Sequence, residues 1–438
     1  MRAQWRRRGA SVMLAASLIA CVPASAEVAS AQVASAQAAS AQVANAQPAG
    51  TLLGATVDDL LAAGRQLSPT LRAAALETAA VAAKAEGADA LDDPTISDSY
   101  QYYKDPGVFS AHTVLLTQSF PLWGKRSLRR EAALADVDAA RGQERAVQDE
   151  IDEKIKVAYA QYFLTNRNIA VNREVAELSR HMRAAAAARY GQGNGDQAAV
   201  IQAMGEETAA KTEAVRLDGE KSAARARLNT LVGRSADAPL AEPVRMRSMP
   251  ATEPVLAALV DRARAANPSL SASTAAIAAA TSRSKLADKA WYPDLTVGAG
   301  PLIQTNDMPV GFSATIGFNI PVPWGREASG QHEAAAQLGA SQQRYDAALL
   351  EIEGALGESV AKLNAARATE TLLQRESMPQ ARATFQTVLA NYSQGKGDLA
   401  TAIAAQHQIH DVELRLLQVQ FDEQIELAAI ERLIGGTL

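Results

Sequence analysis

Two long stretches of the chain carry apolar residues at intervals of three and four positions. The first seam consists of Val147, Ile151, Ile155, Ala158 and Tyr162, and the second of Tyr345, Leu349, Ile352, Leu356, Val360 and Leu363. This spacing places each set on one helical face and predicts coiled-coil-like packing. We predict long helices over about 124–190 and 325–392, each ~100 Å long at about 1.5 Å per residue. Returning helices are predicted over about 196–232 and 398–434.

A two-residue period precedes each long helix. From Phe312 to Ile320, apolar residues alternate with small or polar ones, which is the pattern of a two-faced strand. We predict strands over about 94–104, 111–121, 293–304 and 311–322, paired as two β-hairpins across short stretches that contain Asp and Pro. Shorter helical stretches over about 57–92 and 254–290 come before them, broken near Pro69 and Pro268.

The same phrases recur in the same order about 200 positions apart. The segment 120-FPLWGKR-126 returns as 320-IPVPWGR-326, and 190-YGQGNGD-196 returns as 392-YSQGKGD-398. A period this long indicates two copies of one architecture rather than a solenoid. We predict a first repeat over 51–240, a linker over 241–253 and a second repeat over 254–438. The predicted fold is mainly α with a small β part, each unit joining a β-hairpin to a very long helical hairpin.

The N-terminus has the features of an export signal. Arginines at positions 2, 6, 7 and 8 precede an uncharged apolar run, so residues 1–20 are predicted to be a signal peptide. The only cysteine, Cys21, follows this run, and its context is similar to the lipobox of bacterial lipoproteins. The alternative is cleavage after Ala26, which would discard Cys21. Residues 21–50 repeat Ala, Gln and Ser and predict a flexible tether.

Composition excludes several classes of function. The formal net charge is −5, and the signal peptide carries four bases and no acids, so its removal makes the chain more acidic. Lys and Arg are dispersed among acids, so no nucleic-acid-binding surface is indicated. No phosphate loop, nucleophile elbow or zinc-protease motif is present, so we expect neither an enzyme nor a cofactor. His407 and His410 lie at helical spacing, but no third metal ligand accompanies them, and we interpret them as surface side chains.

Four strands from one chain cannot close a barrel. An open sheet would expose its apolar face and its unpaired edges. Spanning β-structure in a membrane must be closed, and strands of about ten residues have the length needed to cross one at a tilt. We therefore expect several copies to contribute strands to one barrel that the long helices continue as a tube.

With these features the sequence resembles the TolC-type outer membrane efflux proteins, and within them the CzcC-like heavy-metal branch. The resemblance covers about residues 55–438 and rests on the duplicated order, the segment 118-QSFPLWGKR-126 and the paired Tyr-x-x-Gly elements. It implies a homotrimer with a 12-stranded β-barrel in the outer membrane of a Gram-negative bacterium and an α-helical barrel in the periplasm. It also implies partnership with a periplasmic adaptor protein and an inner-membrane RND-type pump.

Two sets of residues are candidate functional sites. The family meets its adaptor at the helical tips, which here are Tyr190, Gly193, Gly195, Asp196, Tyr392, Gly395, Gly397 and Asp398. Each Asp can also cap the returning helix. The alternative to an adaptor contact is that the glycines are simple C-caps of the preceding helices. The strand-to-helix junctions are Pro121, Trp123, Gly124, Lys125, Arg126, Pro321, Trp324, Gly325 and Arg326. We expect their indoles at the membrane interface with the bases near lipid headgroups, or alternatively buried indoles.

The function expected from these features is a passive exit duct, with heavy-metal cations as the expected cargo. A duct for drugs or other small organic molecules is the first alternative. The second is a lipid-tethered periplasmic coiled-coil scaffold that forms no pore. Acidic gating after the second tip, known in better-studied family members, is doubtful because that region reads Leu399-Ala-Thr-Ala-Ile-Ala404.

Overall fold

The computed structural model describes residues 52–102, 110–193, 195–250, 252–304, 309–394 and 396–438. Residues Leu53–Leu438 form one compact unit, which contains all the elements below. The predicted signal peptide, Cys21, the predicted tether and Gly395 lie outside the described residues.

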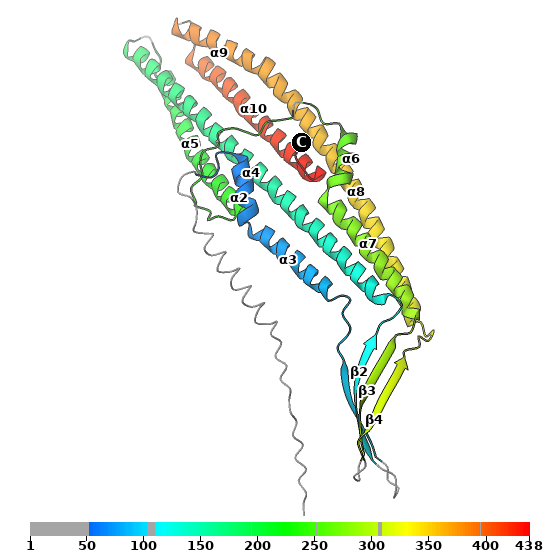
Figure 1. Cartoon of the computed structure of the whole chain (residues 1–438). Helices are drawn as coiled ribbons and strands as arrows, with labels where there is room; N and C mark the ends of the chain where they lie inside the picture. Colours follow the sequence, from blue (N-terminus) through cyan, green and yellow to red (C-terminus); the bar gives the residue numbers. More distant parts are fainter. Residues whose placement is uncertain (1–51, 103–109, 194, 251, 305–308, 395) are drawn as a thin grey trace, which may run out of the picture. The chain divides into compact units, whose positions relative to one another are not determined.

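The two repeats have the same order of elements (Figure 1). The first comprises α2 (Val57–Leu67), α3 (Pro69–Glu86), β1 (Thr95–Gln101), β2 (Ala111–Phe120), α4 (Lys125–Gly191) and α5 (Gln197–Val232). The second comprises α6 (Leu256–Ala266), α7 (Pro268–Asp288), the 3-10 turn η1 (Lys289–Trp291), β3 (Leu295–Gln304), β4 (Gly311–Phe318), α8 (Arg326–Leu372), the π-helical turn η2 (Leu373–Ser377), α9 (Met378–Ser393) and α10 (Leu399–Ile434). The predicted fold class, mainly α with a small sheet in a duplicated unit, is confirmed.

Two details differ from the sequence-based expectation. The helix expected to run unbroken over 325–392 contains the π-helical turn η2, so α8 and α9 are separate elements. Pro379 lies at the second position of α9, where its ring and missing N–H disturb the hydrogen bonds of the preceding turn. The last strand, expected to reach 322, ends at Phe318, because Pro321 and Pro323 cannot donate to a ladder.

Each predicted seam contributes to a core of its own repeat. Ile155, Ala158 and Tyr162 are buried with Leu228 of α5. Leu356 and Leu363 are buried with residues of α6, α7 and α10 in the second core. Val147, Tyr345 and Leu349 are only partly buried at the edges of these clusters. The coiled-coil-like spacing therefore identified residues of both cores.

Close helix packing joins the two repeats. A Cβ atom added at Gly142 of α4 would lie 2.8 Å from both the Cβ and the backbone nitrogen of Ala272 in α7. Helix α7 is rich in Ala and Ser, which lets its backbone approach α4. Further along, Lys156 of α4 and Arg247 of the linker each lie 2.9 Å from Glu431 of α10. Apolar packing and a shared carboxylate thus hold the repeats together.

The four strands form one antiparallel sheet in the order β1-β2-β3-β4. The two hairpins meet through β2 and β3, with Phe120 opposite Leu295 and Ala111 opposite Gln304. Residues directly opposite one another lie on the same face, so the register defines two faces across all four strands. β1 and β4 are the outer strands of the sheet and each leaves an edge unpaired within the described residues.

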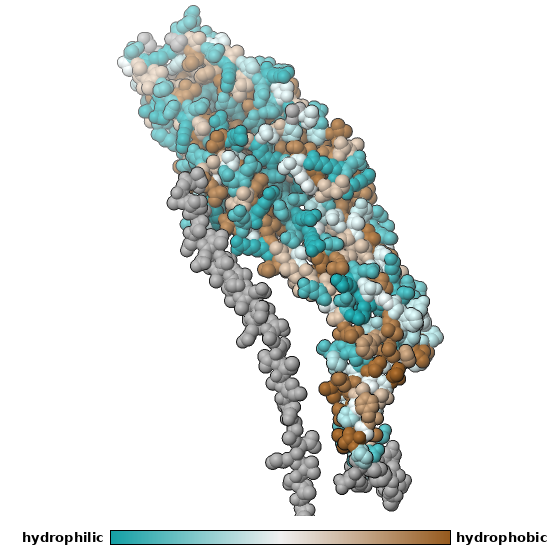
Figure 2. All heavy atoms as spheres, viewed as in Figure 1, coloured by the Kyte–Doolittle hydropathy of each residue, from teal (hydrophilic) through white to brown (hydrophobic). Residues whose placement is uncertain are grey.

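The two faces of the sheet differ in chemistry. The first, which we call the apolar face, includes Ile96, Leu116, Val297, Phe312, Ile316 and Phe318, all of them exposed in the single chain. It also carries Gln118 and the neighbouring pair Asp98 and His112, whose side chains lie 3.7 Å apart. The other face carries Ser, Thr, Gln, Gly, Ala and Leu, for example Ser97, Thr117, Thr296 and Thr315. Figure 2 shows hydrophobic residues gathered over the strands and at their junction with the helices. This sheet has the two chemistries of a membrane barrel wall.

None of the helices in the described part of the chain is both long and apolar enough to cross a membrane.

Candidate functional site

The junction between β2 and α4 is a tight turn built by its own sequence. β2 ends at Phe120 before Pro121, which has no N–H for the ladder. Trp123 has φ 64° and Gly124 has φ 77°, and Trp123 is the one non-glycine residue with positive φ among the described residues. The Lys125 amide then donates to the carbonyl oxygen of Leu122 at 3.2 Å. A Trp in the left-handed region is strained, so its surroundings must hold it there.

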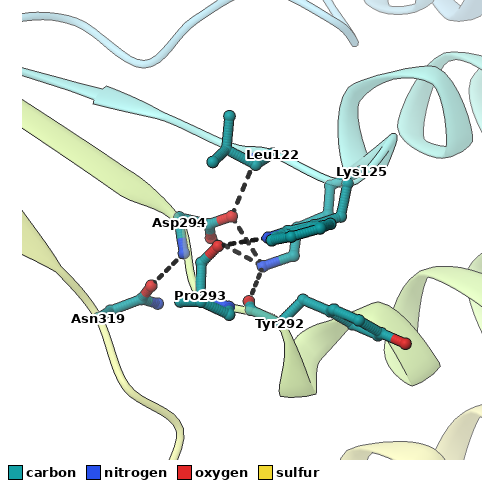
Figure 3. A network of polar contacts seen from close by, with 7 residues as sticks. Leu122, Lys125, Tyr292, Pro293, Asp294 and Asn319 are labelled. Carbon is teal, nitrogen blue, oxygen red and sulfur yellow. Dashed lines mark hydrogen bonds and ion pairs between the residues drawn. The ribbon is translucent and has the colours of Figure 1, made fainter.

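The surroundings are a polar network that links the two repeats (Figure 3). Lys125 is 6% exposed, and its Nζ lies 2.8 and 2.9 Å from the two carboxylate oxygens of Asp294, just before β3. The same ammonium donates to the carbonyl oxygen of Tyr292 at 2.8 Å. Oδ1 of Asp294 also accepts from the Leu122 amide at 3.1 Å, and the Asp294 amide donates to the Asn319 side chain.

The indole of Trp123 is held by the same segment. Its Nε1 donates to the carbonyl oxygen of Pro293 at 2.7 Å, and its ring centroid lies 5.4 Å from that of Tyr292. Lys125 was expected to present its charge to lipid headgroups, but its ammonium is buried against Asp294 within the chain. Arg126 is exposed, and its Nε donates to the carbonyl oxygen of Asp89 at 2.6 Å.

The second junction repeats the sequence but not the contacts. Gly325 has φ 97°, like its counterpart Gly124. Trp324 is 88% exposed, compared with 52% for Trp123, so neither indole is buried within one chain. Arg326 is exposed and has no hydrogen bond or ion pair with any described residue. Pro321 lies between β4 and this turn and is only half-buried. The second junction therefore presents its aromatic ring and its base to the surroundings of the chain.

The first helical tip is closed by its glycines and capped by its aspartate. The Gly193 amide donates to the carbonyl oxygen of Tyr190 at 3.0 Å, with φ 71° at Gly193. A Cβ at Gly195 would lie 2.8 Å from the backbone nitrogen of Tyr190. The Asp196 side chain accepts from the Ala198 amide at 3.0 Å, which is the expected N-cap. Tyr190 is half exposed at this end.

The second tip has a similar backbone and a different cap. A Cβ at Gly397 would lie 3.0 Å from the Tyr392 backbone nitrogen, as at Gly195 in the first tip. Asp398 occupies the N-cap position of α10, but its side chain accepts no capping hydrogen bond. The capping expected of Asp398 is therefore absent.

Arg189, which was not among the residues predicted for the tips, joins the two tips. The Arg189 guanidinium lies 4.9 Å from the ring centroid of Tyr392, and its Nη1 donates to the Tyr392 carbonyl oxygen at 3.2 Å. Tyr392 also packs against a cluster in which Leu399 and Ile403 are buried with Met182 of α4. The apolar segment after the second tip is thus a packing surface between the two helical hairpins.

A buried carboxyl group lies between α8 and α10. Glu423 is 3% exposed, and its Oε1 has no hydrogen-bond partner. Burial and the nearby Glu370 raise the pKa of Glu423 to about 7. Glu370 itself accepts hydrogen bonds from Gln374 at 2.9 Å and from Gln420 at 2.8 Å.

This carboxyl group predicts a pH-dependent stability. Because the pKa of Glu423 is higher in the folded chain than its ordinary value of 4.5, its contribution to stability is lost as pH rises from about 4.5 to about 7. We expect Glu423→Gln to raise the urea midpoint of unfolding at pH 8 and to change it little at pH 5. Glu358→Gln is the control, because Lys362 lowers the pKa of Glu358 and the variant should gain nothing at pH 8. A Glu423→Gln midpoint unchanged at pH 8 would contradict the prediction.

The two histidines do not form a metal site with other described residues. His407 Nε2 lies 2.9 Å from Glu206 Oε2, which links α10 to α5. His410 Nδ1 is buried and has no hydrogen-bond partner. Within the described part of the chain, no group of three or more His, Cys, Asp or Glu side chains is placed to hold a metal ion.

Comparison with known families adds an independent observation. The family model described as "Outer membrane efflux protein" matches residues 60–234 and 259–436, one match for each repeat. The chain belongs to the outer membrane efflux protein family. Its members are the outer membrane channels of tripartite efflux systems. No curated protein sequence matches the chain.

Solved structures of outer membrane efflux channels share the fold. The outer membrane protein VceC from Vibrio cholerae superposes with a TM-score of 0.74 at 18% identity, covering 87% of this chain and 96% of that one. CusC gives a TM-score of 0.75 at 18% identity, covering 90% and 95%. The open state of the MtrE channel from Neisseria gonorrhoeae gives 0.71 at 16% identity, covering 90% and 94%. At these identities the likeness establishes the fold of the chain, which in those channels contributes to a β-barrel continued by a helical barrel.

Proposed function

We propose that this protein is the exit duct of a tripartite efflux system, a homotrimer whose strands form a 12-stranded outer membrane barrel and whose helices cross the periplasm. The observation that carries the proposal is the sheet. One of its faces is mainly apolar, the other is uncharged, and within the described residues its two outer edges are unpaired. Only closure with further strands would satisfy those edges in a membrane. An inner-membrane RND-type pump and a periplasmic adaptor would supply the cargo, and Cys21 would anchor the chain by a lipid.

Channel conductance tests this proposal directly. The purified full-length protein should run as a heat-modifiable trimer from outer membrane fractions and should conduct ions in planar bilayers. A soluble monomer with no conductance would support the scaffold alternative instead. That alternative retains the long helices but gives no reason for a mainly apolar face shared by four strands.

We infer heavy-metal cations as the cargo, with drugs or small organic molecules as the alternative. The support is the resemblance of 118-QSFPLWGKR-126 to the CzcC-like branch, together with an acidic balance in the exported chain. A deletion strain should become sensitive to divalent metal salts and keep its drug resistance. Sensitivity to drugs alone would favour the alternative cargo.

The tips are the proposed adaptor contacts. Gly193 has positive φ, and a Cβ there would meet no atom within 4 Å, so a bulky side chain would project from the tip. We expect Gly193→Trp, and a bulky residue at Gly395, to abolish efflux while trimers remain in the outer membrane. Gly195→Trp is the comparison for a structural defect of the tip, because a Cβ at that position would clash with the Tyr190 backbone. Loss of the trimer in Gly193→Trp would assign this glycine a structural role only.

A further inference from the structure

The contacts of the first junction provide a template for the second. Lys125 follows β2, and its partner Asp294 precedes β3, the neighbouring strand. The ion pair therefore lies where the end of one hairpin meets the beginning of the next. Within one chain that happens once, where the first repeat meets the second.

The hairpin registers identify the equivalent of Asp294 in the first repeat. Thr95 lies opposite Thr117 in the first hairpin, and Thr296 lies opposite Gly317 in the second. The segments Phe120-Pro121 and Ile320-Pro321 align Thr117 with Gly317, so Thr95 corresponds to Thr296. Counting back two residues from each, Asp93 corresponds to Asp294. The Trp-Gly phrases likewise align Lys125 with Arg326.

Neither member of this second pair has a partner among the described residues. Asp93 is exposed just before β1, and its side chain has no hydrogen bond or ion pair with a described residue. Arg326 is equally unpartnered after β4. They lie at opposite edges of the sheet, because β1 and β4 are its two outer strands. One chain alone therefore cannot bring them together while the sheet is intact.

We propose that Arg326 of one copy forms an ion pair with Asp93 of the next copy, as the counterpart between chains of the Lys125–Asp294 pair within a chain. The occupant of the exposed second junction is thus a second copy of this protein. This inference rests on the proposed homotrimer, in which the Arg326–Asp93 pair would join each copy to the next. Charge complementarity supports it, as does the exposure of Trp324, whose counterpart Trp123 packs on Tyr292. The aligned residue Leu91 is also exposed and would receive the Trp324 ring.

A charge swap tests the pair. Arg326→Asp and Asp93→Arg should each lower the fraction of trimer in detergent and the temperature at which the trimer resists SDS. The double variant should restore both toward the wild-type values. Lys84→Glu is the control, since it reverses an exposed base of α3 that has no hydrogen bond or ion pair with a described residue. We expect its trimer to match wild type.

Cross-linking tests the same contact without relying on stability. The double variant Asp93→Cys with Arg326→Cys, treated with a short bismaleimide, should yield covalent dimers and trimers. Each single cysteine variant should yield neither, and the wild-type chain, whose one cysteine is Cys21, reports the background. Native mass spectrometry of the wild-type protein separates the two proposals, since a monomer would overturn the duct itself.

Three outcomes would overturn the inference while leaving the duct in place. Trimeric wild-type protein with unaffected single charge variants would show that the pair is not formed. Single variants that lose the trimer with no rescue in the double variant would assign Arg326 another partner, such as a phospholipid phosphate. Absence of cross-linked species from a trimeric double-cysteine variant would place the two residues apart.

Discussion

Replacing Lys125 with Met should cost about 3 kcal/mol of folding free energy, because it leaves the Asp294 carboxylate without its charge partner. Lys125 is buried, and Asp294 is largely covered beside it. The variant also removes the donor to the Tyr292 carbonyl and so loosens the segment that holds Trp123 in its strained conformation. Urea unfolding of the detergent-solubilised protein, followed by tryptophan fluorescence, measures the loss.

The control for this variant lies one turn further along α4. Arg129→Met removes a half-buried base that has no hydrogen bond or ion pair with a described residue, so we expect a change below about 0.5 kcal/mol. The double variant Lys125→Met with Asp294→Leu should recover part of the loss, because neither charge is then left unpaired. Equal unfolding midpoints for Lys125→Met and Arg129→Met would contradict the importance of the ion pair.

A methyl group at Gly300 should prevent the two hairpins from joining. A Cβ there would clash with the carbonyl oxygen of Val114 in β2, and backbone atoms in a ladder cannot move aside without breaking hydrogen bonds. The pairing is already interrupted at this point, since Thr113 pairs with Leu302 and Leu116 with Ala299 with no pairs between them. Pro301, which lacks an N–H, occupies the gap. We expect Gly300→Ala to leave little or no heat-modifiable folded protein after refolding into detergent or lipid.

Gly317→Ala provides the comparison on the same face of the sheet. Its Cβ would meet only the Thr296 side chain, at 3.9 Å, which is ordinary van der Waals contact. The refolded fraction should match wild type, because the substitution adds a methyl group without displacing the backbone. If both glycine variants refold equally well, strand spacing does not depend on Gly300.

The sequence predicted the elements because their signals are local. Residues only a few positions apart determine each of these signals. They are the helical seams through Ile155 and Leu356, the strand alternation that begins at Phe312, and the glycine caps. The interruption by η2 has a local signal in Pro379, but the prediction of one helix over 325–392 followed the apolar spacing, which does not change where the hydrogen-bond ladder shifts. The end of β4 at Phe318 was misplaced because the alternation continues through Ile320, although the strand pairing does not.

The candidate junction was only partly predictable for the same reason. The recurrence of Trp123 and Trp324 marked both turns, and the positive φ at Gly124 and Gly325 agrees with the need for glycine there. The burial of Lys125 and its ion pair could not be predicted from neighbouring residues, since its partner Asp294 lies 169 residues away. Only the pairing of β2 with β3 brings them together, and that pairing leaves no local signal. Arg189 was missed because its contact with Tyr392 spans 203 residues.

The small, uncharged face of the sheet has a consequence for selectivity. Its described residues from Thr95 to Gly317 include no Asp, Glu, Lys, Arg or His. With the apolar face toward lipid, this surface would line the passage with hydroxyl, amide and methyl groups and no fixed charge. Such a wall offers neither attraction nor repulsion to an ion on the basis of its sign. Selection among exported molecules would then have to take place before they reach the strands. It would occur either between the charged helices or in the pump.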